Sequence, residues 1–119
     1  MKTSLYISLV LLLVLAGCNG KTAATMETTS PDGKTKLTID FKRSTIADPW
    51  TADMKVKAYS WKEGSLHVVE IYADDISSQT VLFDWSDTNH CLITFKLRDN
   101  TERKFQLIAS PDELQLAEV

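Results

Sequence analysis

Few side chains in this sequence could perform acid–base or nucleophilic chemistry. His67 and His90 are the two histidines, and our strand alignment places Ser60 opposite His67. A serine and a histidine work as nucleophile and base only when a third group orients the imidazole. No Gly-x-Ser-x-Gly motif surrounds Ser60, and the spacing places no such third group. The sequence therefore predicts a protein that is not an enzyme and has no catalytic residue.

The acidic residues are concentrated in one part of the chain. Residues 63–91 contain six acids and no lysine or arginine, whereas residues 34–62 are rich in lysine. A calcium loop needs several oxygen ligands from one segment, and no Asp-x-Asp-x-Asp-Gly pattern occurs. We expect ion pairs between neighbouring strands instead, for example Lys57 with Glu70. The sequence predicts no metal site and no cofactor.

Three aromatic residues are candidates for ligand binding. Trp50 follows Asp48 and Pro49 in a predicted loop, and Tyr59 and Trp61 lie on the predicted outer face of a strand. Exposed aromatic rings on a β domain bind sugars or partner proteins. The alternative is ordinary packing, in which a covered outer face makes these rings part of a core. Cys91 shares an apolar face with Ile93 and is predicted to be a buried, unreactive thiol beside Trp85.

The N-terminal residues have the organisation of a secretory signal. Lys2 precedes an apolar run that ends at Ala16 and is too short to span a bilayer, and Leu15, Ala16 and Gly17 come directly before Cys18. This segment resembles the lipobox that ends the signal peptide of bacterial lipoproteins. The resemblance implies cleavage before Cys18, a diacylglycerol on its thiol, acylation of its amine and permanent membrane anchoring. The alternative is an ordinary cleaved signal in which Cys18 has no special role.

This resemblance divides the chain into three parts. Residues 1–17 are the predicted signal peptide, residues 18–33 the lipidated cysteine and a flexible tether rich in Thr, Ala and Ser, and residues 34–119 a single domain. Asn19, where Asp would favour retention in the inner membrane, favours the outer membrane of a Gram-negative envelope. With Cys18 acylated, Cys91 has no disulfide partner. The mature chain has a net charge of −4, which argues against nucleic acid as a partner.

After a turn at residues 30–33, alternation of apolar and polar residues predicts about seven short strands and no helix. The predicted strands span residues 34–42, 54–61, 66–73, 81–85, 91–98, 102–109 and 113–116. This pattern predicts an all-β domain, either a small antiparallel β-sandwich of the immunoglobulin-like kind or a small β-barrel.

Two hairpin registers follow from the loops. A two-residue loop at Glu63 and Gly64 would set Met54 opposite Ala73 and give one apolar face. A three-residue loop at residues 99–101, with Asn100 at a positive φ, would set Phe95 opposite Phe105.

These observations together predict a lipid-anchored protein of the cell envelope that is a non-enzymatic binding or accessory module. Its partners would be the membrane, through Cys18, and a glycan or a protein. One alternative is a carbohydrate-binding accessory lipoprotein that uses Trp50, Tyr59 and Trp61. Another is a periplasmic hydrolase inhibitor, similar in size and anchoring to lysozyme-inhibitor lipoproteins but without their additional cysteines and aromatic-glycine motifs.

Overall fold

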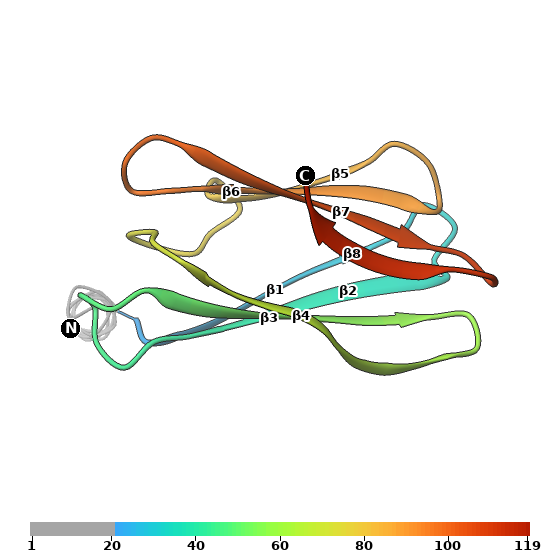
Figure 1. Ribbon diagram of the computed structural model, residues 1–119, viewed down its shortest axis with the longest axis horizontal. Coiled ribbons are helices and arrows are strands. Elements are labelled where there is room, and N and C mark those ends of the chain that lie inside the picture. Colours follow the sequence, from blue (N-terminus) through green and yellow to red (C-terminus); the bar gives the residue numbers. More distant parts are fainter. Residues whose placement is uncertain (1–20) are drawn as a thin grey trace, which may run out of the picture.

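The computed structural model describes residues 21–119, and these residues form two antiparallel sheets and no helix. The first sheet contains β1 (Ala23–Thr29), β2 (Thr35–Lys42), β3 (Trp50–Ala58) and β4 (Trp61–Ile71). The second sheet contains β5 (Val81–Trp85), β6 (His90–Lys96), β7 (Glu102–Ala109) and β8 (Leu114–Glu118). Within each sheet the strands are neighbours in chain order (Figure 1). The predicted all-β architecture is confirmed.

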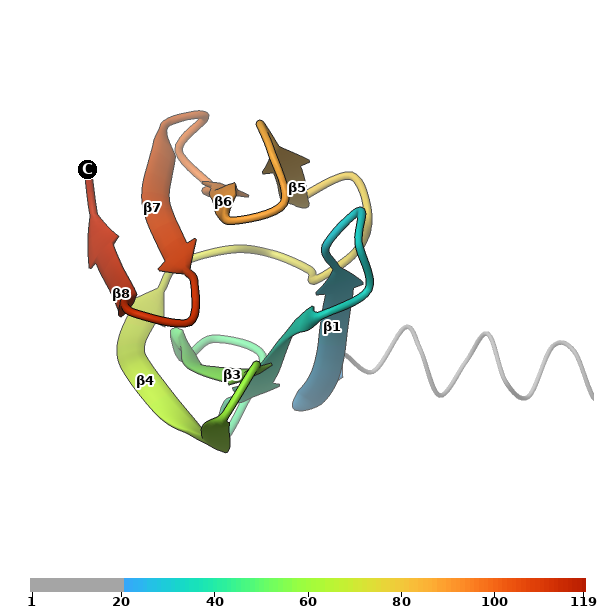
Figure 2. The same ribbon diagram turned by 90° about the vertical axis from the view of Figure 1, so that its right-hand side faces the viewer.

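The two sheets pack face to face around one core, with β4 and β8 along one side and β1 and β5 along the other (Figure 2). Alternate residues of the central strands point inward, because side chains alternate between the two faces of a strand. Those with 0% exposure on β2, β3, β6 and β7 include Leu37, Ile39, Phe41, Met54, Val56, Ile93, Phe105 and Leu107. Burial of each such side chain contributes about 1.5–3 kcal/mol to folding, so these positions dominate the stability of the sandwich.

A row of aromatic rings joins the two sheets through this core. The Phe41 ring on β2 meets Trp50 at a centroid distance of 6.3 Å and Phe95 at 6.0 Å, both edge to face. Phe95 in turn meets Phe105 at 5.5 Å. Edge-to-face pairs of this kind add roughly 0.5–1.5 kcal/mol each beyond the area they bury.

The turn predicted between residues 30 and 33 is present and joins β1 to β2. Gly33 has a φ of 76°, and its N–H donates to the carbonyl of Ser30 at 2.9 Å. The Ser30 hydroxyl donates to Asp32 at 2.6 Å and accepts the N–H of Thr35 at 3.0 Å. The serine, aspartate and glycine therefore fix the turn by the local hydrogen bonds that such residues favour.

The predicted flexible tether is wrong for residues 23–29, which form β1 along the edge of the first sheet. Every residue of β1 pairs with β2, from Ala23 opposite Lys42 to Thr29 opposite Lys36. Ala24 and Met26 pack partly buried against the core, while the alternate residues are exposed. An edge strand buries less of its surface than a central strand, and β1 therefore lacks the run of bulky apolar residues by which the other strands were predicted. With β1 included, the described residues contain eight strands where about seven were expected.

The predicted register of the β3–β4 hairpin is also wrong. The loop lies at Tyr59 and Ser60, and Gly64 is a strand residue opposite Val56. Tyr59 has a φ of 51° at the first loop position, where the favoured two-residue hairpin turns require a positive value. Met54 is consequently opposite His67, which rules out the expected pairing of Ser60 with His67.

The same shift separates Lys57 from Glu70, which were expected to pair. Lys57 lies opposite Lys36, and Glu70 lies opposite Thr51. The ion pairs found in this sheet are Lys36 with Glu27 at 3.3 Å, and Lys55 with Asp40 at 2.9 Å and Asp53 at 3.9 Å. Lysines of β2 and β3 are thus paired with acidic residues on β1, β2 and β3.

The β6–β7 hairpin keeps its predicted faces but shifts by two residues. Phe95 lies opposite Arg103, and Ile93 lies opposite Phe105. The Leu97 N–H donates to the carbonyl of Thr101 at 2.9 Å, so the three loop residues are 98–100. The positive φ predicted for Asn100 is confirmed at 67°. A shift of two residues preserves which side chains are buried, because the strand period is two.

Candidate functional site

Trp50, the first of the predicted ligand-binding aromatics, belongs to the core. It is the first residue of β3 and only 1% exposed, and its indole N–H donates to the carbonyl of Ala73 at 3.1 Å. The Arg43 guanidinium lies 3.9 Å from the ring centroid and covers its remaining face. The expected position of Trp50 in an exposed loop is therefore wrong, and its ring has no free face for a ligand.

Tyr59 and Trp61 lie at the other end of β3. The eight residue steps from Trp50 to Ala58 span about 27 Å at the rise of a β-strand, so the three aromatics do not form one platform. Trp61 is 36% exposed, and its indole N–H donates to the carbonyl of Ser110 at 2.8 Å. The hydroxyl of Tyr59 accepts a hydrogen bond from Asn89 at 2.8 Å. Both polar groups are used to join the first sheet to the second.

Asn89 and Trp85 complete these cross-sheet contacts, and the sequence had not indicated a role for Asn89. The Asn89 side-chain amide also donates to the carbonyl of Ala109 at 2.7 Å. Trp85 lies opposite Cys91, as expected, and its indole N–H donates to the Thr28 hydroxyl at 2.9 Å. The only sequence signal for Asn89 is its place in a polar turn, which does not reveal its distant partners. We call this region, with the loops at residues 30–34, 59–60, 86–89 and 110–113, the distal end.

The opposite end of the sandwich, which we call the N-terminal end, contains residues 21–22 and the loops at residues 43–49, 72–77 and 97–101. Arg43 is its centre: its Nε donates to the carbonyl of Lys21 at 2.8 Å, and its Nη1 donates to the carbonyl of Ile46 at 3.2 Å. Beside Arg43 and Trp50 lies a recess of about 310 Å³. The recess is lined by Lys21, Ala24, Arg43, Trp50, Asp74, Asp75, Ile76 and Ser77.

The charges around this recess are already paired in part. The Asp74 carboxylate lies 3.1 Å from the Arg98 guanidinium, and the backbone N–H of Arg98 donates to the carbonyl of Tyr72 at 3.0 Å. A ligand pocket of the usual kind is mainly apolar with a few convergent polar groups. Four of the eight residues that line the recess at the N-terminal end are charged, namely Lys21, Arg43, Asp74 and Asp75, so its lining is not the mainly apolar one of such a pocket.

The residues considered for acid–base chemistry are dispersed. The His67 ring packs against Phe105 with ring centroids 5.3 Å apart and planes tilted by 53°, and Ser60 lies in the loop at residues 59–60. His90 pairs with the Asp87 carboxylate at 2.8 Å, and this hydrogen bond lowers the pKa of Asp87 below its usual value. Burial raises the pKa of the Cys91 thiol to about 12, which opposes formation of the nucleophilic thiolate. No nucleophile, base and orienting group come together among these residues.

On the outer face of the first sheet, Lys55 forms ion pairs with two neighbouring carboxylates, those of Asp40 and Asp53. Asp40 lies opposite Asp53, and the Lys55 ammonium is 2.9 Å from Asp40 and 3.9 Å from Asp53. The hydrogen bond from Lys55 lowers the pKa of Asp40. Within residues 21–119, no three His, Cys, Asp or Glu residues are grouped so that they could hold a metal ion.

Cys18, the predicted lipidation site, lies outside the described residues. None of residues 21–119 belongs to a helix long and apolar enough to cross a membrane. No protein-family model, no curated protein and no solved structure matches the chain.

Proposed function

We propose that the chain is a lipid-anchored protein of the bacterial cell envelope whose β-sandwich acts as a non-enzymatic binding or accessory module. The observation that carries this proposal is the sequence Leu15-Ala16-Gly17-Cys18, followed five residues later by the first strand of a folded domain at Ala23. Cleavage before Cys18 would therefore remove residues 1–17 and leave every described strand of the domain intact. Asn19 after the cysteine favours the outer membrane in a Gram-negative envelope.

The non-enzymatic role is supported by the dispersion of the candidate catalytic groups. His90 is paired with Asp87, and His67 packs against Phe105. Catalysis by a side-chain pair requires the nucleophile and its base to be within hydrogen-bond reach. For the fold, we infer a sandwich of two meanders, because the strands of each sheet are neighbours in chain order. An immunoglobulin-like Greek key would have non-consecutive strands as neighbours in its sheets.

The anchor is tested by growing cells that make the full chain with a labelled fatty acid. We expect the purified protein to have a lipid-bearing mass that begins at Cys18. The variant Cys18→Ser should lose both the label and the association with washed membranes. Cys91→Ala is the matched control and should keep both, because these are the two cysteines of the chain. An unlabelled mass that begins at another residue would overturn the proposal.

A carbohydrate-binding role that uses Trp50, Tyr59 and Trp61 together is less well supported by the structure than by the sequence. Trp50 is covered by Arg43, and of the three rings Trp61 presents the most accessible surface, at 36% exposure. A glycan panel monitored by tryptophan fluorescence tests what is left of this role: a shift that disappears in Trp61→Ala would favour it. Retention of a hydrolase on the immobilised protein would instead favour the inhibitor role.

A further inference from the structure

The structure fixes the point at which the chain would leave the domain toward the membrane. The carbonyl of Lys21 accepts the Nε–H of Arg43 at 2.8 Å, and the carbonyl of Thr22 accepts the Arg43 backbone N–H at 2.9 Å. Arg43 is itself held over Trp50 at 3.9 Å. Residues 21 and 22 are therefore attached to the folded domain and are not part of a free tether.

Only Asn19 and Gly20 separate Lys21 from Cys18. Three Cα-to-Cα steps of about 3.8 Å each cannot exceed about 11 Å. The polar headgroup layer of one leaflet is roughly 5–8 Å deep, since a bilayer is about 40–45 Å thick with a hydrocarbon core of about 30 Å. A lipid on Cys18 would thus hold Lys21 at or just above the headgroups.

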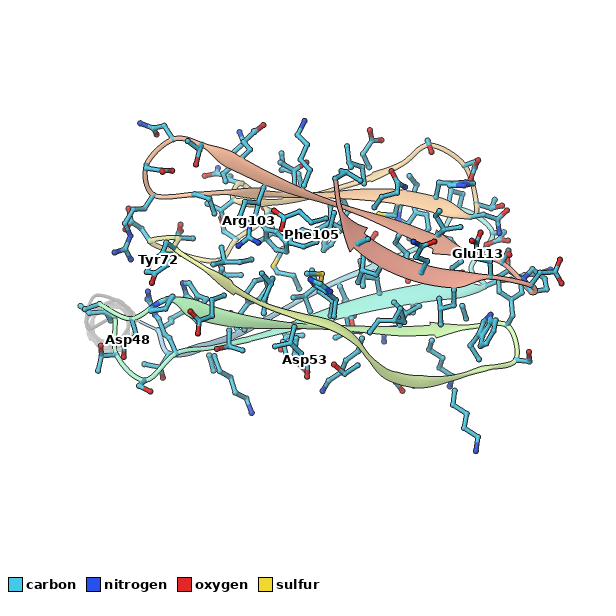
Figure 3. The ribbon with its side chains drawn as sticks, viewed as in Figure 1. Asp48, Asp53, Tyr72, Arg103, Phe105 and Glu113 are labelled. Atoms are coloured by element: carbon cyan, nitrogen blue, oxygen red, sulfur yellow. The ribbon has the colours of Figure 1, made fainter. Side chains whose placement is uncertain are left out.

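We infer that the N-terminal end of the sandwich is a membrane-contact surface, with the loops at residues 43–49 and 72–77 seated on the lipid headgroups. This inference rests on the proposed lipidation of Cys18. These loops surround Lys21, since Arg43 bonds it directly and Asp74 and Asp75 line the same recess. Figure 3 shows Asp48 and Tyr72 at this end and Glu113 at the opposite end.

The side chains of this surface suit a lipid interface. Ile46 is 53% exposed and Tyr72 is 55% exposed, and both are large apolar or amphipathic side chains. Tyrosine is enriched where a protein meets the headgroup layer, because its ring is apolar and its hydroxyl is polar. The distal end, with Trp61 and Tyr59, would then face away from the membrane and be the end that a partner can reach.

The charges of this end identify the kind of lipid surface. Its segments carry three basic residues, Lys21, Arg43 and Arg98, and four acidic residues, Asp48, Asp74, Asp75 and Asp99. A nearly balanced surface is not drawn to anionic lipids by charge. The contact is therefore expected on zwitterionic headgroups, held by the short chain, and it should not weaken in salt.

The test uses the full lipidated protein in phosphatidylcholine vesicles that contain a lipid with a nitroxide on its headgroup. A fluorophore is attached at Ile46→Cys in the N-terminal end or, as the matched control, at Asp112→Cys in the distal end, where the residue is exposed. Cys91 is 0% exposed and should not take the label. We expect the emission at position 46 to fall by about half, because the label lies at headgroup depth, and the emission at position 112 to be unchanged.

A spacer variant separates the effect of the short chain from other causes. A Gly/Ser linker of about 15 residues inserted between Gly20 and Lys21 adds a root-mean-square span of roughly 20 Å and should reduce the quenching at position 46. Equal, weak quenching at positions 46 and 112 in protein with a confirmed lipid mass would overturn the inference and leave the proposed function standing. Quenching that depends on protein density and not on the nitroxide would also overturn it and assign this end to a second copy. A mass without lipid would refute the proposed function itself.

Discussion

Arg103 is expected to close one side of the sandwich, and replacing it should cost more than breaking an ordinary surface ion pair. It lies on β7 and forms two parallel hydrogen bonds with Glu118 on β8, from Nε at 2.8 Å and from Nη2 at 2.7 Å. Its Nη1 also donates to the carbonyl of Glu70 on β4 at 2.8 Å, which joins the second sheet to the first. Figure 3 shows the side chain between the two sheets beside Phe105.

The magnitude follows from the exposure and geometry of these bonds. The Arg103 side chain is 30% exposed and that of Glu118 is 43% exposed, so solvent screens their attraction. Exposed ion pairs contribute about 0.2–1 kcal/mol, and a paired, planar geometry favours the upper half of that range. Glu118→Gln should therefore lower the free energy of unfolding by about 0.5–1 kcal/mol. Arg103→Met also removes the charged donor to Glu70 and should cost about 2 kcal/mol in total.

The pH dependence separates the two contributions. The hydrogen bonds from Arg103 lower the pKa of Glu118, so the ion pair stabilises the folded state above the ordinary glutamate pKa and is lost as the pH falls through the lowered value. The difference between wild type and Glu118→Gln should be full at pH 7 and should shrink steadily below about pH 4.5. Urea unfolding followed by tryptophan fluorescence at several pH values measures it.

Glu102→Gln is the control, because Glu102 lies 4.0 Å from Lys104 in an exposed pair and its loss should change stability by less than about 0.5 kcal/mol. If Glu118→Gln costs as much at pH 3 as at pH 7, the ion pair is not the cause. If Arg103→Met costs no more than Glu118→Gln, the bond to Glu70 contributes nothing and the reasoning about the joined sheets is refuted.

Three further changes test other parts of the fold. Gly64 is a strand residue with open space where an alanine Cβ would lie, so Gly64→Ala should raise the free energy of unfolding by about 0.5 kcal/mol. Gly33→Ala, at a φ of 76°, should lower it by about 1 kcal/mol. If both variants lower the free energy of unfolding equally, Gly64 is a turn residue and not a strand residue. Cys91, 0% exposed and with its pKa raised to about 12, should not react with iodoacetamide at pH 8 until urea unfolds the protein, and rapid native alkylation would contradict its burial. Thr35→Val should stabilise the protein by about 1 kcal/mol, because among the described residues the buried Thr35 hydroxyl has no hydrogen-bond partner; a measured loss in chemical denaturation would mean that the hydroxyl is satisfied.

The sequence determined the faces of the strands, because side-chain alternation depends only on the strand period. Leu37, Ile39 and Phe41 alternate with polar residues within the predicted strand 34–42 and so share a face, and all three are 0% exposed. Local turn chemistry was also readable: Gly33 and Asn100 have the positive φ values that their residue types favour. These features need no knowledge of distant partners.

The tertiary structure decided the registers and the places of the aromatic residues. A glycine suggested the loop at Gly64, but the chain turns at Tyr59, whose hydroxyl is bonded by Asn89 of the second sheet. Both hairpin registers bury the same face of β3, so the alternation of residues does not choose between them. The contacts with the second sheet then outweigh the local preference of Gly64 for a turn. β1 could not be predicted from the sequence for a related reason: its small residues form a strand only because they pair with the edge of β2. Trp50 lies in the core because its ring is enclosed by Arg43 and by the carbonyl of Ala73, which is 23 residues away in the sequence.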